Sequence, residues 1–144
     1  MKIRKSTTKD LKEIGKLMKT EFSKFPFNEK DSIDAVLKSL RFYFRMGKIF
    51  IAIADGKIAG VIIVKFEQYW EGKVMIIEDL AVGNKFQNKW VGKELMNFAE
   101  NYAKNKKTKL ILFSTNKKSR AIEFYKKEEY KIDKDRIFMK KKVK

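Results

Sequence analysis

The chain of 144 residues contains no cysteine and no histidine. These two absences exclude disulfide bonds, zinc sites built from Cys or His, cysteine nucleophiles and histidine general bases. Any acid–base chemistry must therefore use Asp, Glu, Tyr or Lys side chains, or water that they hold. We expect no metal site.

Long hydrophobic runs are also missing. The longest, Ile49–Ala54 and Val61–Val64, are strand-sized, and a membrane-spanning helix needs about 20 apolar residues. The N-terminal segment MKIRKSTTKD has no apolar core after its charges, so it does not read as a secretory signal. We therefore expect a cytoplasmic protein without a membrane partner, built as one domain over residues 1–144.

Arginine is scarce and lysine abundant. The net charge is +17, yet arginine occurs only five times. A strong positive charge favours polyanionic ligands such as nucleic acid or a phosphorylated cofactor. Lysine spread along solvated faces is also a common compositional bias, and we favour that interpretation. Nucleic acid stays an open but less favoured partner.

The spacing of apolar residues predicts a mixed α/β order of elements. We expect a first strand, two helices, a three-stranded meander, a helix, a strand, a last helix and a closing hairpin. The first strand is expected at residues 1–5, the first helix is capped by Thr7 or Thr8, and the second helix runs from Asn28 or Asp31 to Gly47. The meander consists of strands 49–54, 58–66 and 74–82, and the next helix runs from Trp90 or Val91 to Asn105. A strand at 109–113, a helix capped by Asn116 or Ser119, and a hairpin of 130–132 with 136–139 complete the chain.

The stretch Val74–Ala103 organises the chain. An apolar strand pattern carries two adjacent acids, Glu78 and Asp79, and a polar loop then leads into an amphipathic helix. The first turn of a helix has unpaired N–H groups and a dipole that favours negative charge, so this unit predicts an anion site. Because side chains alternate along a strand, one acid is expected to face solvent; alternation does not account for both.

Three segments of the chain resemble the GNAT superfamily of acyl-CoA-dependent N-acyltransferases. They are the strand IIEDLAV (Ile76–Val82), the loop and helix start QNKWVGKELM (Gln87–Met96), and TNKKSRAIEFYKKEEY (Thr115–Tyr130). The resemblance implies an α/β (α+β) fold, a single GNAT-like domain. Its central mixed, mostly antiparallel sheet would have about six to seven strands, with four helices around it.

The resemblance also implies where acetyl-CoA would bind. Backbone groups of Leu80, Ala81 and Val82 would hold the pantetheine arm in a gap between the third meander strand and the strand after the helix. The N–H groups from Gln87 to Lys93 would hold the pyrophosphate. The complete set implied for the cofactor is Leu80, Ala81, Val82, Gln87, Asn88, Lys89, Trp90, Val91, Gly92, Lys93, Asn116 and Tyr125. Trp90 stands where the family's loop often has glycine.

The implied reaction moves an acetyl group from acetyl-CoA to a primary amine. Glu78 matches the family's proposed base, and Tyr125 matches the tyrosine that protonates the CoA thiolate. Asp79 would orient the base or hold a cationic amine. The aromatic residues Phe25 and Phe27, in the loop between the first two helices, either line the acceptor pocket or seal a core edge.

Several alternatives stay open. The chain could be a non-catalytic GNAT-like module that binds CoA or a polyanion such as nucleic acid, and another acyl-CoA could replace acetyl-CoA. Glu78 could be a structural ion-pair partner, Tyr125 a core residue and Asn116 a helix cap. The Glu78–Asp79 pair suggests that the acceptor is a cationic amine, whereas the net positive charge of the chain argues against a polycationic acceptor. A homodimer is compatible with the resemblance.

Overall fold

The computed structural model describes all residues from 1 to 144, which form two compact units, Met1–Ser114 and Thr115–Lys144. The first unit holds most of the regular structure. In chain order the elements are β1 (Lys2–Lys5), the 3₁₀ turn η1 (Thr8–Asp10), α1 (Leu11–Phe22), α2 (Ile33–Met46), β2 (Lys48–Ala54), β3 (Lys57–Tyr69), β4 (Gly72–Val82), the 3₁₀ turn η2 (Asn84–Phe86), α3 (Val91–Asn105), β5 (Leu110–Leu112) and, in the second unit, α4 (Ala121–Lys127).

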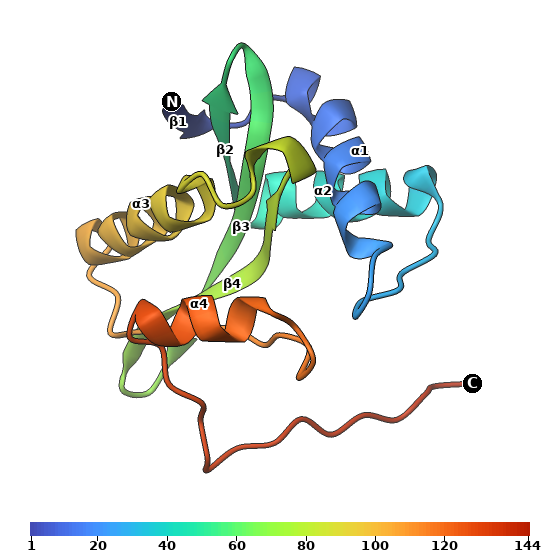
Figure 1. The fold of residues 1–144 in the computed structure, drawn as a ribbon. Coiled ribbons are helices and arrows are strands. Elements are labelled where there is room, and N and C mark those ends of the chain that lie inside the picture. The colour runs from blue at the N-terminus through green and yellow to red at the C-terminus, as the bar shows by residue number, and fades with distance from the viewer. The chain divides into compact units, whose positions relative to one another are not determined.

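The first unit is a five-stranded sheet covered by helices on both faces. The strand order is β1-β2-β3-β4-β5; the first four strands are antiparallel neighbours, and β5 joins β4 in parallel after α3. Figure 1 shows α1 and α2 on one side of the sheet and α3 on the other. A parallel return needs a crossover, which α3 supplies.

Two hydrophobic layers hold this unit together. On the α1 and α2 side, Ile14 and Leu40 pack with strand residues such as Ile51 and Ile63, and all four are almost completely buried. On the other side the ring of Phe50 contacts the ring of Phe98 on α3, with centroids 4.8 Å apart. Burying one such side chain stabilises a fold by about 1.5–3 kcal/mol, so these layers fix the strands that carry the acids.

Strands β4 and β5 pair over only a short stretch. Val74–Ile76 of β4 lies opposite Leu110–Leu112 of β5, and β4 then continues to Val82 with β3 as its only partner. The N–H and C=O groups on the other edge of β4 therefore have no strand beside them from Ile77 onward. This gap lies where the resemblance places the pantetheine arm.

The fold class and the four α-helices are confirmed, but the expected sheet of six to seven strands is wrong. The sheet has five strands, and no strand follows Leu112. Residues 131–144 are exposed and without regular structure, so the predicted closing hairpin of 130–132 with 136–139 does not form. A two-stranded hairpin is marginal by itself, and the apolar side chains of Ile132, Ile137, Phe138 and Met139 stay exposed instead of packing into a core.

No helix of the structure is both long enough and apolar enough to span a membrane.

Candidate active site

A β-bulge in β4 brings the two acids to the same face of the sheet. Asp79 lies opposite Ile63 of β3, and Ile77 lies opposite the next residue, Val64, so Glu78 is an extra residue with no partner on β3. On a regular strand adjacent side chains point to opposite faces. An extra residue interrupts that alternation. Contacts of Glu78 with α2 and the position of Asp79 beside α1 and α2 show that both carboxylates reach this side.

The carboxylate of Glu78 is held at both oxygens. The Lys65 ammonium lies 3.0 Å from Oε1, and the Tyr43 hydroxyl donates a 3.2 Å hydrogen bond to Oε2. The hydrogen bond to Glu78 raises the pKa of Lys65, and burial together with the Glu78 charge raises the pKa of Tyr43. Both neighbours therefore stay protonated at neutral pH and fix the orientation of this carboxylate.

Asp79 has a different environment, although it is the next residue. No side chain or backbone group donates a hydrogen bond to it, and no cation pairs with it. Burial raises the pKa of Asp79 to about 7, and the negative charges of Glu78 and Glu29 add to this effect. Neighbouring carboxyl groups whose surroundings differ in this way are typical of acid–base or ligand-binding sites.

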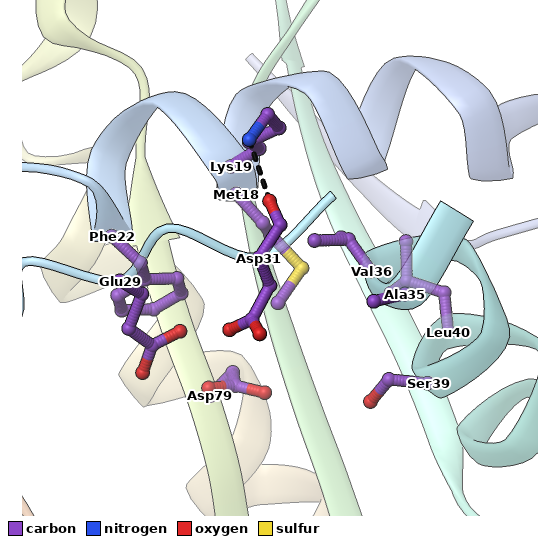
Figure 2. A pocket seen from close by; sticks show the side chains of 10 residues that line it. All are labelled: Met18, Lys19, Phe22, Glu29, Asp31, Ala35, Val36, Ser39, Leu40 and Asp79. Carbon is purple, nitrogen blue, oxygen red and sulfur yellow. Dashed lines mark hydrogen bonds between the residues drawn. The ribbon is translucent and has the colours of Figure 1, made fainter. Parts of the chain in front are cut away.

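A cavity of about 310 Å³ lies over Asp79, between α1, α2 and the loop that joins them. Figure 2 shows its lining side chains, which are Met18, Lys19, Phe22, Glu29, Asp31, Ala35, Val36, Ser39, Leu40 and Asp79. Neither aromatic residue expected at the acceptor pocket lines this space. Phe27 packs edge-on against Phe22 with ring centroids 5.2 Å apart, and Phe25 is 72% exposed.

The loop before α3 has the form of an anion site. The helix begins at Val91, and no side chain caps it, so the N–H groups of Val91 and Gly92 have no acceptor within the helix. Trp90 immediately before it adopts the left-handed conformation (φ 69°), which is why glycine suits this position. The indole ring is 70% exposed and lies near the Lys93 ammonium, 5.4 Å from the ring centroid.

Other residues assigned to this loop occupy its exposed side. Asn88 also has a positive φ (62°), and Lys89 is exposed. Gln87 is anchored: its amide donates to the Val82 carbonyl at 2.9 Å and to Glu21 Oε1 at 2.7 Å. Gln87 thus fixes the start of the loop against the end of β4.

The three residues expected to hold the pantetheine arm lie beyond the bulge. Leu80, Ala81 and Val82 pair with β3 on one side only, so their other edge belongs to the open part of β4. The bulge, the open edge and the uncapped helix start follow one another within sixteen residues of chain, from Glu78 to Lys93.

The second unit contains Asn116 and Tyr125, two residues that the resemblance assigns to the cofactor. Tyr125 lies on α4, where burial raises its pKa to about 12, and the rings of Phe124 and Tyr130 lie beside it. Asn116 does not cap this helix. Its Oδ1 accepts a 2.8 Å hydrogen bond from the Lys118 N–H, whereas Ser119 Oγ accepts from Ala121 N at the helix start.

Sequence reasoning missed four residues of this site. Glu29 and Asp31 belong to a loop, where no periodicity indicates which side chains turn inward. Tyr43 lies on α2, where the spacing of apolar residues predicts the buried face but not which polar group reaches the site. Lys65 interrupts the apolar run of β3. A single charge inside a buried strand is costly unless it is paired, and this is the feature of the sequence that could have indicated its role.

Residues 11–129 match the model of the acetyltransferase (GNAT) family, and this match runs through both units. The chain belongs to the GNAT acetyltransferase family. No curated protein matches the sequence.

Solved structures support the same fold for this GNAT chain. A possible acetyltransferase from Clostridium difficile 630 has a TM-score of 0.88 at 15% identity, over 99% of this chain and 98% of that one. An aminoglycoside acetyltransferase from an uncultured soil metagenomic sample, in complex with sisomicin, has a TM-score of 0.77 at 19% identity, over 99% and 96%. A transcriptional regulator from Bacillus halodurans C-125 has a TM-score of 0.82 at 18% identity, over 96% and 98%. Identities this low show the shared fold only.

Proposed function

We propose that this chain transfers the acetyl group of acetyl-CoA to a primary amine, with the amine bound on the α1 and α2 side of β4. The observation that carries the proposal is the bulge at Glu78, because it sets two carboxylates beside an open strand edge. The open edge at Leu80–Val82 would hold the pantetheine arm, and the start of α3 would hold the pyrophosphate.

Glu78 is the candidate base. A protonated amine must lose a proton before it attacks the thioester carbonyl, and a carboxylate oriented by Lys65 and Tyr43 can accept it directly or through one water. The attack forms the C–N bond, and the C–S bond then breaks. The second proton that the nitrogen loses on becoming an amide balances the proton delivered to the thiolate. A strand N–H near Leu80 would stabilise the negative charge that develops on the carbonyl oxygen.

Tyr125 is the candidate acid. Its pKa of about 12 means that the phenol keeps its proton at neutral pH, in the form that can protonate a departing thiolate. Replacement by phenylalanine would remove this proton and retain the ring. We expect Tyr125→Phe to lower kcat by about 10²-fold, within the usual range for one general acid.

The test begins with calorimetric titration of acetyl-CoA into the protein, with ATP as a phosphate-containing control. Selective one-site binding of acetyl-CoA is expected. Release of free CoA thiol is then followed with a panel of amines and peptides, for the native protein, Glu78→Gln and Tyr125→Phe. If neither selective binding of acetyl-CoA nor release of CoA thiol is observed, the proposal that this chain is an enzyme is wrong.

A second candidate is a binding module that holds CoA or nucleic acid without catalysis. The net charge of +17 and the exposed indole of Trp90 beside Lys93 favour it. Binding to a polyanion should weaken steeply as salt rises, because counterions are released from the polyanion. Cofactor bound in a formed cleft should depend on salt only modestly, so one salt series separates the two candidates.

A further inference from the structure

Lysines gather at one end of the sheet, on the face that α3 covers. Lys5 lies opposite Phe50 in the pairing of β1 with β2. The Phe50 ring contacts the ring of Tyr102 on α3, with centroids 5.0 Å apart. Lys48 precedes Phe50 by two residues on β2, and side chains two residues apart on a strand share a face. Lys5 and Lys48 are therefore diagonal neighbours on the α3 side of the sheet.

Two further lysines reach the same place from α3 and β4. The Lys106 ammonium, just beyond the last residue of α3, lies 5.5 Å from the centroid of the Tyr102 ring. The Lys73 ammonium lies 5.6 Å from the centroid of the Phe66 ring, and the Phe66 and Tyr102 rings are 5.9 Å apart. We call these four side chains the basic patch, and they are Lys5, Lys48, Lys73 and Lys106.

The charges of the basic patch are not neutralised within the protein. None of its lysines forms a salt bridge. The charge of the Lys5 ammonium lowers the pKa of Lys48, and partial burial and the charge of Lys106 act in the same direction. The dipole of α3 favours a cation at its C-terminal end, but it does not explain the three lysines on strands. An anion that binds between these like charges would relieve their mutual repulsion.

The kind of anion follows from the residues that are present. Arginine, whose planar fork recognises a carboxylate through two parallel hydrogen bonds, is absent from the basic patch, whereas a lysine ammonium is a compact point charge that suits phosphate oxygens. The rings of Phe66 and Tyr102 are partly buried and each already has a lysine over it, so neither is free to stack on a base. Three exposed lysines continue the positive surface past the end of α3, namely Lys104, Lys107 and Lys109.

We propose that the basic patch binds the phosphate backbone of nucleic acid and does not read its bases. Contacts of this kind are electrostatic and independent of sequence. The patch is separate from the proposed acetyl-CoA site, because the start of α3 lies about 22 Å away along a helix of 15 residues. The inference therefore does not depend on the proposed acetyl transfer.

The test is a salt series of the binding of a fluorescent DNA duplex, followed by fluorescence anisotropy. The slope of log K against log salt falls by about 0.9 for each phosphate contact that is lost, so Lys5→Gln, Lys48→Gln and Lys106→Gln should each reduce it by about that amount. Lys38→Gln is the matched control, because it removes the same charge from an exposed position on α2, on the other side of the sheet. The control should leave the slope unchanged, and two duplexes of unrelated sequence should bind equally.

Urea unfolding separates a loss of binding from a loss of folding. Lys48→Gln removes a charge that Lys5 repels, so its free energy of unfolding should equal or exceed that of the native protein. An equal change of slope in Lys38→Gln would overturn the inference, because it would show binding by net charge alone. Competition by acetyl-CoA would also overturn it by placing the duplex at the start of α3. Tighter binding of poly-glutamate than of the duplex, with the same dependence on the patch, would show an acidic protein partner instead.

Discussion

Replacement of Asp79 by asparagine should stabilise the free protein at alkaline pH and change little at acid pH. In the folded chain burial raises the pKa of Asp79 to about 7, against an ordinary value of 3.8. Below pH about 4 the carboxyl group is protonated in both the folded and the unfolded state, so aspartic acid and asparagine are nearly equivalent there. Between pH 4 and 7 the unfolded chain releases the proton that the folded chain retains. The native protein thus loses stability relative to the variant as pH rises through this window.

The size of the effect follows from the shift in pKa. A change of about three units corresponds to about 4 kcal/mol at 1.36 kcal/mol per unit. Solvent at the mouth of the cavity screens the charge, so we expect about 2–4 kcal/mol, reached near pH 8 and constant above it. The difference in unfolding free energy between Asp79→Asn and the native protein is the quantity to measure, because other titrating groups cancel from it.

The assay is urea unfolding of both proteins at several values of pH from 4 to 9. Glu71→Gln provides the matched control, because Glu71 is an exposed acid in the turn between β3 and β4. The control should show a difference near zero at every pH. A difference for Asp79→Asn that is the same at pH 5 and pH 9 would refute the reasoning, since a carboxyl group that ionises normally would not distinguish them.

Three further predictions concern the scaffold around the site. Gly47→Ala should reduce the free energy of unfolding by about 2–3 kcal/mol, because the added methyl group would lie 2.5 Å from the Val64 carbonyl oxygen; urea unfolding measures it. Asp10→Asn should cost about 1–2 kcal/mol at neutral pH by breaking the paired hydrogen bonds from Arg4 (2.8 and 3.1 Å). Because the pKa of Asp10 is lowered to about 2, that loss should shrink in thermal melts as pH falls from about 4 toward 2. Trp90→Gly should leave stability within about 1 kcal/mol, since relief of the left-handed backbone offsets the added chain entropy, and calorimetry should find acetyl-CoA bound at least as tightly.

Each of these predictions has an outcome that contradicts it. Gly56→Ala is the comparison for Gly47→Ala, because nothing lies within 4 Å of its added methyl group and only its positive φ (71°) opposes the change. Equal losses of unfolding free energy at both sites would show that a small shift of the backbone removes the close contact with Val64. An Asp10→Asn loss that stays constant down to pH 2 would contradict the ion pair with Arg4. Weaker acetyl-CoA binding in Trp90→Gly would mean that the indole itself contacts the donor.

Much of the first unit could be predicted from periodicity and turn residues. The pattern of Ile33, Val36 and Leu40 predicts one face of α2, and Gly47 ends that helix as expected. Its start differs from the prediction, because Ser32 caps it and not Asn28 or Asp31. The Asp55-Gly56 pair marks the β2–β3 hairpin, which forms as expected. These features are local, because each depends on residues within a few positions of one another.

The arrangement of the acids depends on longer-range information. A bulge is defined by the register between β3 and β4, and the sequence of β4 alone reads as a regular strand in which Glu78 and Asp79 diverge. The positions of Glu29 and Asp31 depend on the path of the loop between α1 and α2. The closing hairpin fails for a related reason: its alternating pattern is local, whereas a stable strand also needs a neighbour.

The positive charge of the chain does not decide which acceptor it binds. An excess of +17 suggests that a polycation should be repelled. Exposed lysines act through water and salt, however, and their field decays over about 8 Å at physiological ionic strength. Within the cavity between α1 and α2, the carboxylate of Asp79 is largely out of water and acts through a less polar path. The global charge should therefore slow the approach of a protonated amine at low salt, whereas Asp79 should determine how long it stays. An association rate that rises with salt, together with a dissociation rate that increases in Asp79→Asn, would separate the two effects.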